Sequence, residues 1–154
     1  MDSREYFELL KDIAAQGREC HMVVTGNSMA PFLCHERDTV YFKKAPDRLK
    51  TGDIVFFQRT NGQFVMHRIC RVVQTQNKTN GRPAFYLTGD NQTEIEGPVY
   101  PEQIFAKITK VKRKGNFSDP HSFDWFFFAH IWIHMIRIRR PLMQLYRKLA
   151  SFFK

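Results

Sequence analysis

Residues 51–73 read TGDIVFFQRTNGQFVMHRICRVV, and this stretch decides the fold. Two runs rich in Val, Ile and Phe, at 53–58 and 64–73, flank a short polar connection that contains Asn and Gly. Runs of branched and aromatic residues bounded by turn residues are typical of β-strands. The stretch therefore predicts two strands with a short connection at 60–62.

Similar runs lie on both sides of this stretch and predict a mainly β domain. Further strands are expected at 21–25, 38–42, 84–88 and 104–112, with polar connections at 43–52, 75–83 and 90–101. Six strands with no long helix between them indicate mostly antiparallel pairing. A short amphipathic helix is expected first, because Asp2 or Ser3 can cap an apolar repeat that Gly17 ends.

The positive charge lies almost entirely in the last third of the chain. We expect three parts: an N-terminal helix at 1–17, the β domain at 18–115 and a helical tail at 116–154. Residues 107–154 hold 11 basic and two acidic residues, whereas residues 1–106 hold 13 of each. A neutral body with a basic tail indicates an anionic partner, and phospholipid and nucleic acid are the usual candidates.

The tail is also rich in aromatic residues. The apolar run at 123–136 contains Asp124 and two histidines, and it is shorter than the roughly 18 to 20 residues of a membrane span. A second amphipathic stretch follows Pro141. Aromatic and basic residues on such helices predict an anchor to an anionic membrane surface through residues 123–154. The alternative is that these helices fold back onto the β domain or onto a partner subunit.

Other sequence features restrict the class of protein. The N-terminus lacks the pattern of a secretory signal or a membrane span, so we expect a cytoplasmic protein peripheral to the membrane. Cys20, Cys34 and Cys70 are odd in number and lack the spacing of a metal or redox site, which favours free thiols. Neither a metal-ligand cluster nor a nucleotide-binding loop is recognisable, so no cofactor is expected.

Two segments contain residues that could perform chemistry. Ser28 lies in TGNSMAP at 25–31, after a predicted strand, and a tight loop can expose its hydroxyl and offer backbone N–H groups to an oxyanion. His67 lies within a predicted strand. Taken singly, such a serine more often bonds to its local backbone, and a strand histidine is more often structural.

The order of four blocks changes this assessment. GNSMAP at 26–31 is followed by TGDIVFF at 51–57, MHRI at 66–69 and LTGDN at 87–91. This order resembles the type I signal peptidase family and its relatives, the LexA-type self-cleaving repressors, over about residues 22–112. The resemblance implies a signal peptidase-like mixed β fold, with Ser28 as nucleophile and His67 as base. It also implies a serine-type endopeptidase that cleaves after small residues.

The base resembles that of one branch of the family. Bacterial signal peptidases and LexA-like proteins use lysine, whereas the endoplasmic-reticulum and archaeal type has histidine in a Val-His-Arg-Val context. Histidine has an ordinary pKa near 6.5 and needs little tuning to act as a base. We therefore expect activity to rise between about pH 6 and 7.5 as His67 loses its proton.

The third catalytic residue is left open by the sequence. The resemblance implies an acid at or shortly after the Gly-Asp-Asn block, which here offers Asp90 first and Glu96 second, with Glu94 also placed near the family position. A solvated loop carboxylate is the alternative for each glutamate. Two departures from the family are Arg37-Asp38, where the family has Gly-Asp, and the absence of an N-terminal anchor.

These observations favour an endopeptidase that trims leader or signal-like peptides at a membrane surface. Asn27, Gly26 and the Ser28 N–H are candidates to hold the oxyanion. One alternative is a LexA-like regulator with a DNA-binding tail. Against nucleic acid as the partner, no helix-turn-helix pattern and no self-cleavage site precede Ser28. The other alternative is a binding module that keeps the fold without the chemistry.

Overall fold

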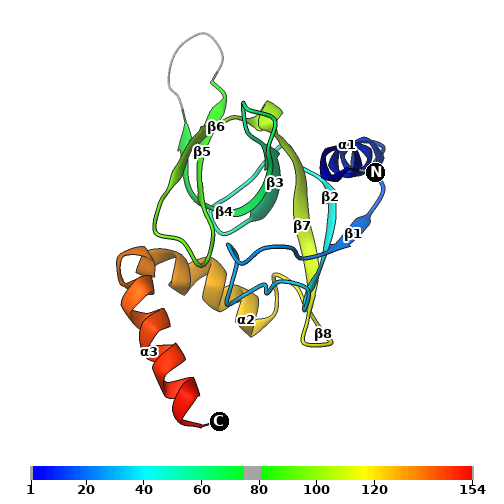
Figure 1. Ribbon diagram of the computed structural model, residues 1–154. Helices are drawn as coiled ribbons and strands as arrows, with labels where there is room; N and C mark the ends of the chain where they lie inside the picture. Colours follow the sequence, from blue (N-terminus) through cyan, green and yellow to red (C-terminus); the bar gives the residue numbers. More distant parts are fainter. Residues whose placement is uncertain (1, 75–80, 154) are drawn as a thin grey trace.

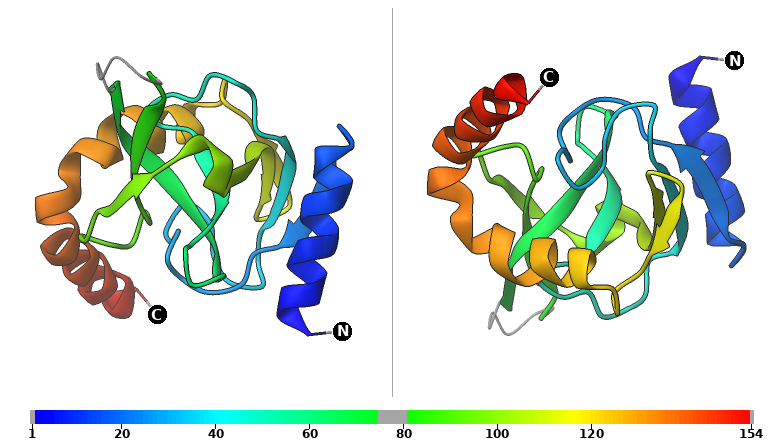
Figure 2. Two further views of the ribbon diagram at one scale, coloured as in Figure 1. Left: turned by 90° about the horizontal axis from the view of Figure 1, so that it is seen from above. Right: turned by 90° about the horizontal axis from the view of Figure 1, so that it is seen from below.

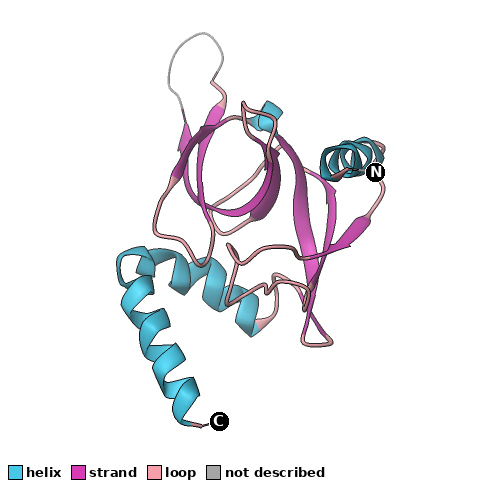
Figure 3. Cartoon of the chain, viewed as in Figure 1, coloured by secondary structure: helices cyan, strands magenta, loops and turns pink. Residues whose placement is uncertain are grey.

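An eight-stranded antiparallel sheet with helices at both ends of the chain forms the body of the protein. The computed structural model describes residues 2–74 and 81–153, so most of the connection expected at 75–83 lies outside the described residues (Figure 1). The sheet order is β1-β2-β7-β3-β4-β5-β6, and β8 pairs with β7. Figure 3 shows that the strands lie together while the helices lie outside them.

The expected strands are confirmed with small changes of boundary. They are β1 (Cys20–Val23), β2 (Thr39–Lys44), β3 (Ile54–Gln58), β4 (Phe64–Gln74), β5 (Pro83–Thr88) and β7 (Ile104–Arg113). Every pairing is antiparallel. The expected antiparallel β domain is therefore confirmed. The helices at both ends of the chain make the whole protein a mixed α and β structure.

Two short strands were not expected. β6 (Glu96–Val99) lies in the segment interpreted as a connection, and β8 (Asn116–Ser118) forms a hairpin with β7. β6 contains Gly97 and Pro98, which are disfavoured in strands and hide it from a propensity argument. It pairs with β5 at only two positions, Phe85 with Val99 and Leu87 with Glu96. The segment after it includes the 3₁₀ turn η1 (Pro101–Gln103).

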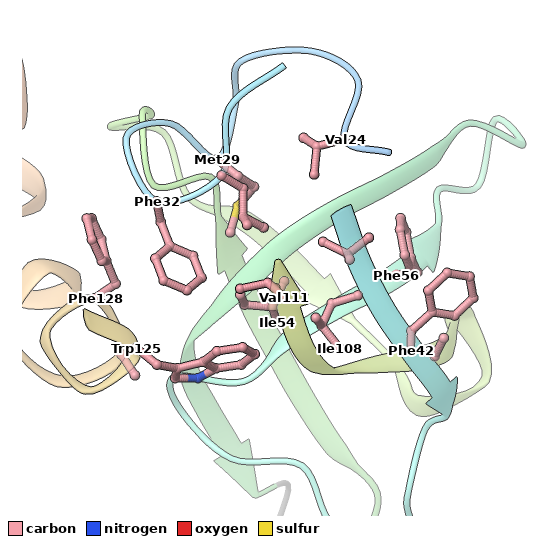
Figure 4. Packing of buried hydrophobic residues seen from close by; sticks show 14 of the residues in the cluster. Val24, Met29, Phe32, Phe42, Ile54, Phe56, Ile108, Val111, Trp125 and Phe128 are labelled. Atoms are coloured by element: carbon pink, nitrogen blue, oxygen red, sulfur yellow. The ribbon is translucent and has the colours of Figure 1, made fainter. Parts of the chain in front are cut away.

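Strand β3 is buried on both faces, which explains its continuous apolar run. Ile54 and Phe56 belong to one hydrophobic cluster, and Val55 and Phe57 belong to the other. Figure 4 shows the first cluster, in which Phe32 from the serine loop approaches Trp125 and Phe128 of the C-terminal tail. Because neighbouring residues of a strand point to opposite faces, β3 links both halves of the core.

Helix α1 (Ser3–Ala15) forms as the sequence predicts. The Asp2 carboxylate accepts a hydrogen bond from the Glu5 N–H at 2.9 Å, which caps the first turn. Leu10 and Ala14 are buried against the sheet, and Phe7 stacks on Phe64 of β4 with ring centroids 5.2 Å apart. The helix therefore packs on the β domain beside β1 and β2 (Figures 1 and 2).

The first half of the tail folds back onto the β domain, as the alternative interpretation allowed. It consists of α2 (Phe123–Phe126), the π-helical turn η2 (Phe127–Ile131) and the 3₁₀ segment η3 (Trp132–Ile138). Trp125 and Trp132 are 4% and 7% exposed, and the Trp125 ring meets Phe32 edge-on at 5.6 Å. These residues are core residues, so an anchor cannot extend over the whole of 123–154.

The second half of the tail is α3 (Arg139–Phe152), which extends away from the sheet (Figures 1 and 2). Among residues 2–74 and 81–153, no helix is both long enough and apolar enough to cross a bilayer.

Candidate active site

The loop that carries Ser28 is fixed at its base by Asp38. The Val24 N–H donates to the Asp38 carbonyl and the Glu36 N–H donates to the Val24 carbonyl, each at 2.8 Å. The buried Asp38 carboxylate accepts from the Cys34 N–H at 2.8 Å and from the Lys114 N–H at 3.2 Å. Asp38 therefore closes the loop, although Arg37 precedes it where the resembled family has glycine.

Arg37 also contributes to this closure. Its guanidinium donates twice to Asp38, at 2.7 and 2.8 Å. Burial alone would raise the pKa of Asp38, but the hydrogen bonds from Arg37 and from backbone N–H groups outweigh it and lower that pKa. Asp38 is consequently ionised at neutral pH and holds the loop.

The Gly-Asp-Asn block supports the serine from the other side. The Asn91 N–H donates to the Ser28 carbonyl at 2.9 Å, and the Asn91 side chain donates to the Asn27 carbonyl at 3.2 Å. A Cβ at position 89 would lie 2.3 Å from the Ser28 carbonyl oxygen. Only glycine permits this approach, since backbone atoms cannot yield as a flexible side chain can. Two of the four sequence blocks thus meet in space.

Ser28 and His67 line the same cavity, which has a volume of about 270 Å³. Ser28 is half-buried and Met29 beside it is fully buried, so the loop directs neighbouring side chains in different directions. His67 is 3% exposed and pairs across the sheet with Val55 of β3. The structure therefore brings the expected nucleophile and base to one pocket.

The walls of this cavity combine apolar and polar residues and come from several elements. Its apolar residues include Phe7 of α1, Met22 of β1, Phe56 of β3 and Met66 of β4, and its polar residues include Arg59 and Gln92. The Gly89 N–H donates to the Gln92 side chain at 3.2 Å. Arg59 and Gln92 were not identified from the sequence, because only the folded register places them beside His67.

Glu96 approaches His67 from β6. Its Oε1 lies 3.5 Å from His67 Nδ1, which is a long contact rather than a hydrogen bond, and Nδ1 has no hydrogen-bond partner among the described residues. The Glu96 carboxylate also accepts two hydrogen bonds from Arg59, at 2.6 and 2.8 Å. These bonds from Arg59 are the main reason that the pKa of Glu96 is lowered.

His67 is strongly biased towards its neutral form. Burial lowers its pKa from 6.5 to about 4, against the opposing attraction of the Glu96 charge. The rise of activity expected between pH 6 and 7.5 therefore does not agree with this environment. A base with a pKa of about 4 is already deprotonated at pH 6.

Asp90 forms an ion pair with Arg68. It is fully buried, and its two carboxylate oxygens accept from Arg68 Nε and a terminal nitrogen, each at 2.9 Å. Arg68 also donates to the Gly52 carbonyl at 2.9 Å. This ion pair ties β4 to the Gly-Asp-Asn block, which indicates a structural role for Asp90. Glu94 is exposed and pairs with Arg140 at 3.2 Å, so Glu96 is the acid placed beside His67.

The expected oxyanion donors are divided by the structure. The Gly26 N–H donates to His35 Nδ1 at 2.9 Å and is therefore occupied, while the Asn27 side chain is exposed at the loop tip. Within the described parts of the chain, His, Cys, Asp and Glu side chains form no group of three or more able to hold a metal ion. The three cysteines are free, as expected.

The site defines a candidate serine–histidine centre on a β scaffold. Comparison with known proteins adds no assignment, because no protein-family model matches the chain and no curated protein is significantly similar to it.

Proposed function

We propose that this chain is a serine endopeptidase in which His67 activates Ser28, with the mixed β architecture of the signal peptidase and LexA-like group. The observation that carries the proposal is the cavity lined by both residues, with Glu96 behind the imidazole. The same four sequence blocks that resemble the family surround this cavity or brace its walls. The resemblance and the geometry are separate lines of support.

The chemistry follows from the position of the two nitrogens of His67. Nδ1 is nearest Glu96, so Nε2 takes the proton of the Ser28 hydroxyl as its oxygen attacks the peptide carbonyl. The imidazolium then gives that proton to the leaving amine when the C–N bond breaks. A water molecule, deprotonated by the same nitrogen, hydrolyses the resulting ester and frees Ser28.

Glu96 supplies the negative charge that the buried imidazolium needs. The low pKa of His67 means that charging it is costly, and a carboxylate 3.5 Å away lowers this cost in the transition state. We infer that Glu96 shifts towards Nδ1 when substrate closes the cavity, since apo contacts of this type are often long. Asp90, which pairs with Arg68, supports the loop and adds a weaker charge that also favours the imidazolium.

The substrate proposed is a leader or signal-like peptide. The family resemblance implies small residues before the cleaved bond, and the apolar part of the cavity wall, which includes Met29, Phe56 and Met66, fits uncharged side chains. We place the enzyme on the cytoplasmic side, peripheral to a membrane, because basic residues flank the aromatic tail.

Cleavage of a peptide library, followed by mass spectrometry, tests the proposal. Ser28→Ala is expected to reduce the rate at least about 1,000-fold, and His67→Ala by a similar factor, because the two act as a unit. Ser151→Ala is the matched control, since its hydroxyl only donates to a carbonyl of α3. A fluorophosphonate probe should label wild type and Ser151→Ala but not Ser28→Ala. An unchanged cleavage rate in Ser28→Ala would exclude the mechanism.

One observation favours a second candidate, a peptide-binding module without catalysis. Arg59 donates hydrogen bonds to both oxygens of the Glu96 carboxylate. In a binding module this carboxylate would stay bound to Arg59 and would not assist His67, while the pocket would still accept a peptide. Such a module would bind peptides equally well in wild type and in Ser28→Ala, and neither would cleave them. Cleavage by wild type excludes this candidate.

A further inference from the structure

Helix α3 has an apolar face with no partner among the described residues. The helix packs on η3 near its start, where Arg139 is buried and Leu142 and Met143 contact the core. Beyond this point Figures 1 and 2 show it leaving the body of the protein. Five large residues of its later turns are at least half exposed: Leu145, Tyr146, Leu149, Phe152 and Phe153.

The five residues lie on one side of the helix. Leu145, Leu149 and Phe152 follow the i, i+4, i+7 spacing, and Tyr146 and Phe153 lie beside them. The opposite side carries Arg140, Gln144, Arg147, Lys148 and Ser151. Residues 139–153 contain no acidic residue. The helix therefore presents an apolar stripe bordered by positive charge alone.

The charge decides which kind of partner fits this helix. A second copy of α3 could cover the apolar stripe, but it has no acidic residue to pair with the basic side, which would stay without a partner. Nucleic acid would match the basic side but would leave the apolar stripe exposed to water. An anionic lipid surface matches both sides at once, because phosphates meet the basic residues while the stripe enters the acyl boundary.

We propose that α3 alone docks this protein in the plane of an anionic membrane surface, with Phe152 and Phe153 inserted. A helix of 14 residues is about 21 Å long, which is too short to cross a hydrocarbon core of about 30 Å. We assign the docking to α3 rather than to residues 123–138, because Trp125, Phe128 and Trp132 fix that segment in the protein core and only Phe123 and Phe126 of its aromatic side chains are at least half exposed. This inference is independent of the role given to Ser28.

Vesicle co-sedimentation of the full chain tests the inference, using the Ser28→Ala protein so that catalysis plays no part. The probe is a vesicle of 30% phosphatidylglycerol in phosphatidylcholine, compared with phosphatidylcholine alone. Binding is expected only to the anionic vesicles and should weaken as salt rises. The double change Arg147→Gln and Lys148→Gln should weaken it roughly 30-fold.

The apolar stripe is tested separately. Phe152→Ser with Phe153→Ser should weaken binding by at least about 30-fold, because two exposed aromatic side chains no longer enter the lipid. The matched control is Gln144→Ala with Ser151→Ala on the opposite side, which should bind as wild type does. Because both pairs lie on exposed positions, circular dichroism should show the same melting temperature for each.

Brominated lipids distinguish α3 from the rest of the tail. If α3 docks alone, they leave the fluorescence of Trp125 and Trp132 unquenched, since both rings are in the core. Strong quenching would instead show that residues 123–138 enter the membrane, and would overturn the inference. It would equally be overturned by absent binding to anionic vesicles, by binding that survives the two Phe changes, or by concentration-dependent dimerisation that those changes abolish.

Discussion

His67 is almost completely buried, and this burial is the largest influence on its charge. Burial favours the neutral ring and lowers its pKa to about 4, while the neighbouring Glu96 charge favours protonation only partly. The neutral ring is the form that a general base needs before it accepts a proton. The same burial makes the protonated intermediate costly, so the acid at position 96 matters most in the transition state.

This environment predicts the pH dependence of peptide cleavage. The value of kcat/KM should rise with pH through about 4 and then stay level from pH 6 to 7.5, because the free enzyme has already lost the His67 proton. Initial rates between pH 3.5 and 8 measure this, with circular dichroism at each pH to verify folding. An acidic limb centred near 6.5 would show that the imidazole is solvated.

The same shift has a consequence for stability. A histidine with a pKa of 6.5 when unfolded and about 4 when folded binds more protons in the unfolded state between these values. Stability should therefore fall as pH decreases from 6.5 to 4, by on the order of 3 kcal/mol from this group. Urea unfolding at pH 4 and pH 7 should show a smaller difference in His67→Gln than in wild type. Equal differences in the two proteins would contradict the assignment.

Arg59 controls how much Glu96 helps His67. Arg59 holds both carboxylate oxygens and its own charge opposes protonation of the imidazole. Arg59→Met should therefore raise the pKa of His67, which an NMR titration of the ring protons measures directly. Arg82→Met, which removes an exposed pair with Glu102, is the control and should leave that pKa unchanged. A lower pKa in Arg59→Met would contradict this account.

At the scale of elements, the C-terminal segment that contains Trp132 and Arg139 holds the Gly-Asp-Asn loop, and this loop in turn contacts Ser28. Arg139 is buried and donates to the carbonyls of Gly89 and Gln92 at 2.9 and 3.0 Å, and to that of Trp132 at 3.1 Å. The Trp132 ring nitrogen donates to the Asp90 carbonyl at 2.7 Å. The loop so held in turn binds the Ser28 carbonyl through Asn91. Under the proposed mechanism, Arg139 is therefore a positioning residue for Ser28.

Replacing Arg139 tests this chain of contacts. Arg139→Met removes one donor from each of the carbonyls of Gly89, Gln92 and Trp132, which should cost about 2–4 kcal/mol of stability. In protein that is still folded at low temperature, kcat should fall at least tenfold with little change in KM, because the serine loop loses its support. Arg139→Lys should recover part of kcat, since an ammonium can still donate.

The neighbouring Arg140 provides the control for this test. It is exposed and pairs only with the exposed Glu94, so Arg140→Met should change neither kcat nor stability measurably. The positioning role would be contradicted if kcat in Arg139→Met fell only in proportion to the fraction of folded protein and Arg139→Lys recovered none of it. Arg139 would then have a structural role only.

The sequence predicts those parts of the fold and site that depend on local pattern. Six strands, α1 and the amphipathic α3 follow from runs and spacing, and Ser28 and His67 follow from their surrounding blocks. Strand β6 cannot be predicted in this way, because Gly97 and Pro98 are disfavoured in strands. It forms because it pairs with β5 in the folded protein. The partners of Asp90 and Glu96 also depend on register, since their arginines lie 22 and 37 residues away. No local pattern distinguishes a structural carboxylate from one beside a base.

At the scale of the whole molecule, the tail consists of two parts with different physical roles. Residues 123–138 supply Trp125, Phe128 and Trp132 to the core, and Gly52 permits their approach because a Cβ there would lie 3.1 Å from Ala129. Residues 144–153 contribute no buried side chain. The β domain expected at 18–115 is therefore incomplete without the first part of the tail and complete without the last.

Two truncations separate these roles. A chain ending at Met143 loses only exposed side chains, so its melting temperature should stay within about 2 °C of wild type and its kcat/KM on a soluble peptide within about twofold. Its binding to anionic vesicles should be lost. A chain ending at Ser122 loses three buried aromatic residues, each worth about 3–5 kcal/mol, against a total stability of about 5–15 kcal/mol. It should show no cooperative unfolding transition by calorimetry. A cooperative transition near the wild-type temperature in this shorter chain would mean that residues 123–138 are an appendage, and that the contacts of Trp132 and Arg139 with the Gly-Asp-Asn block do not hold the site together.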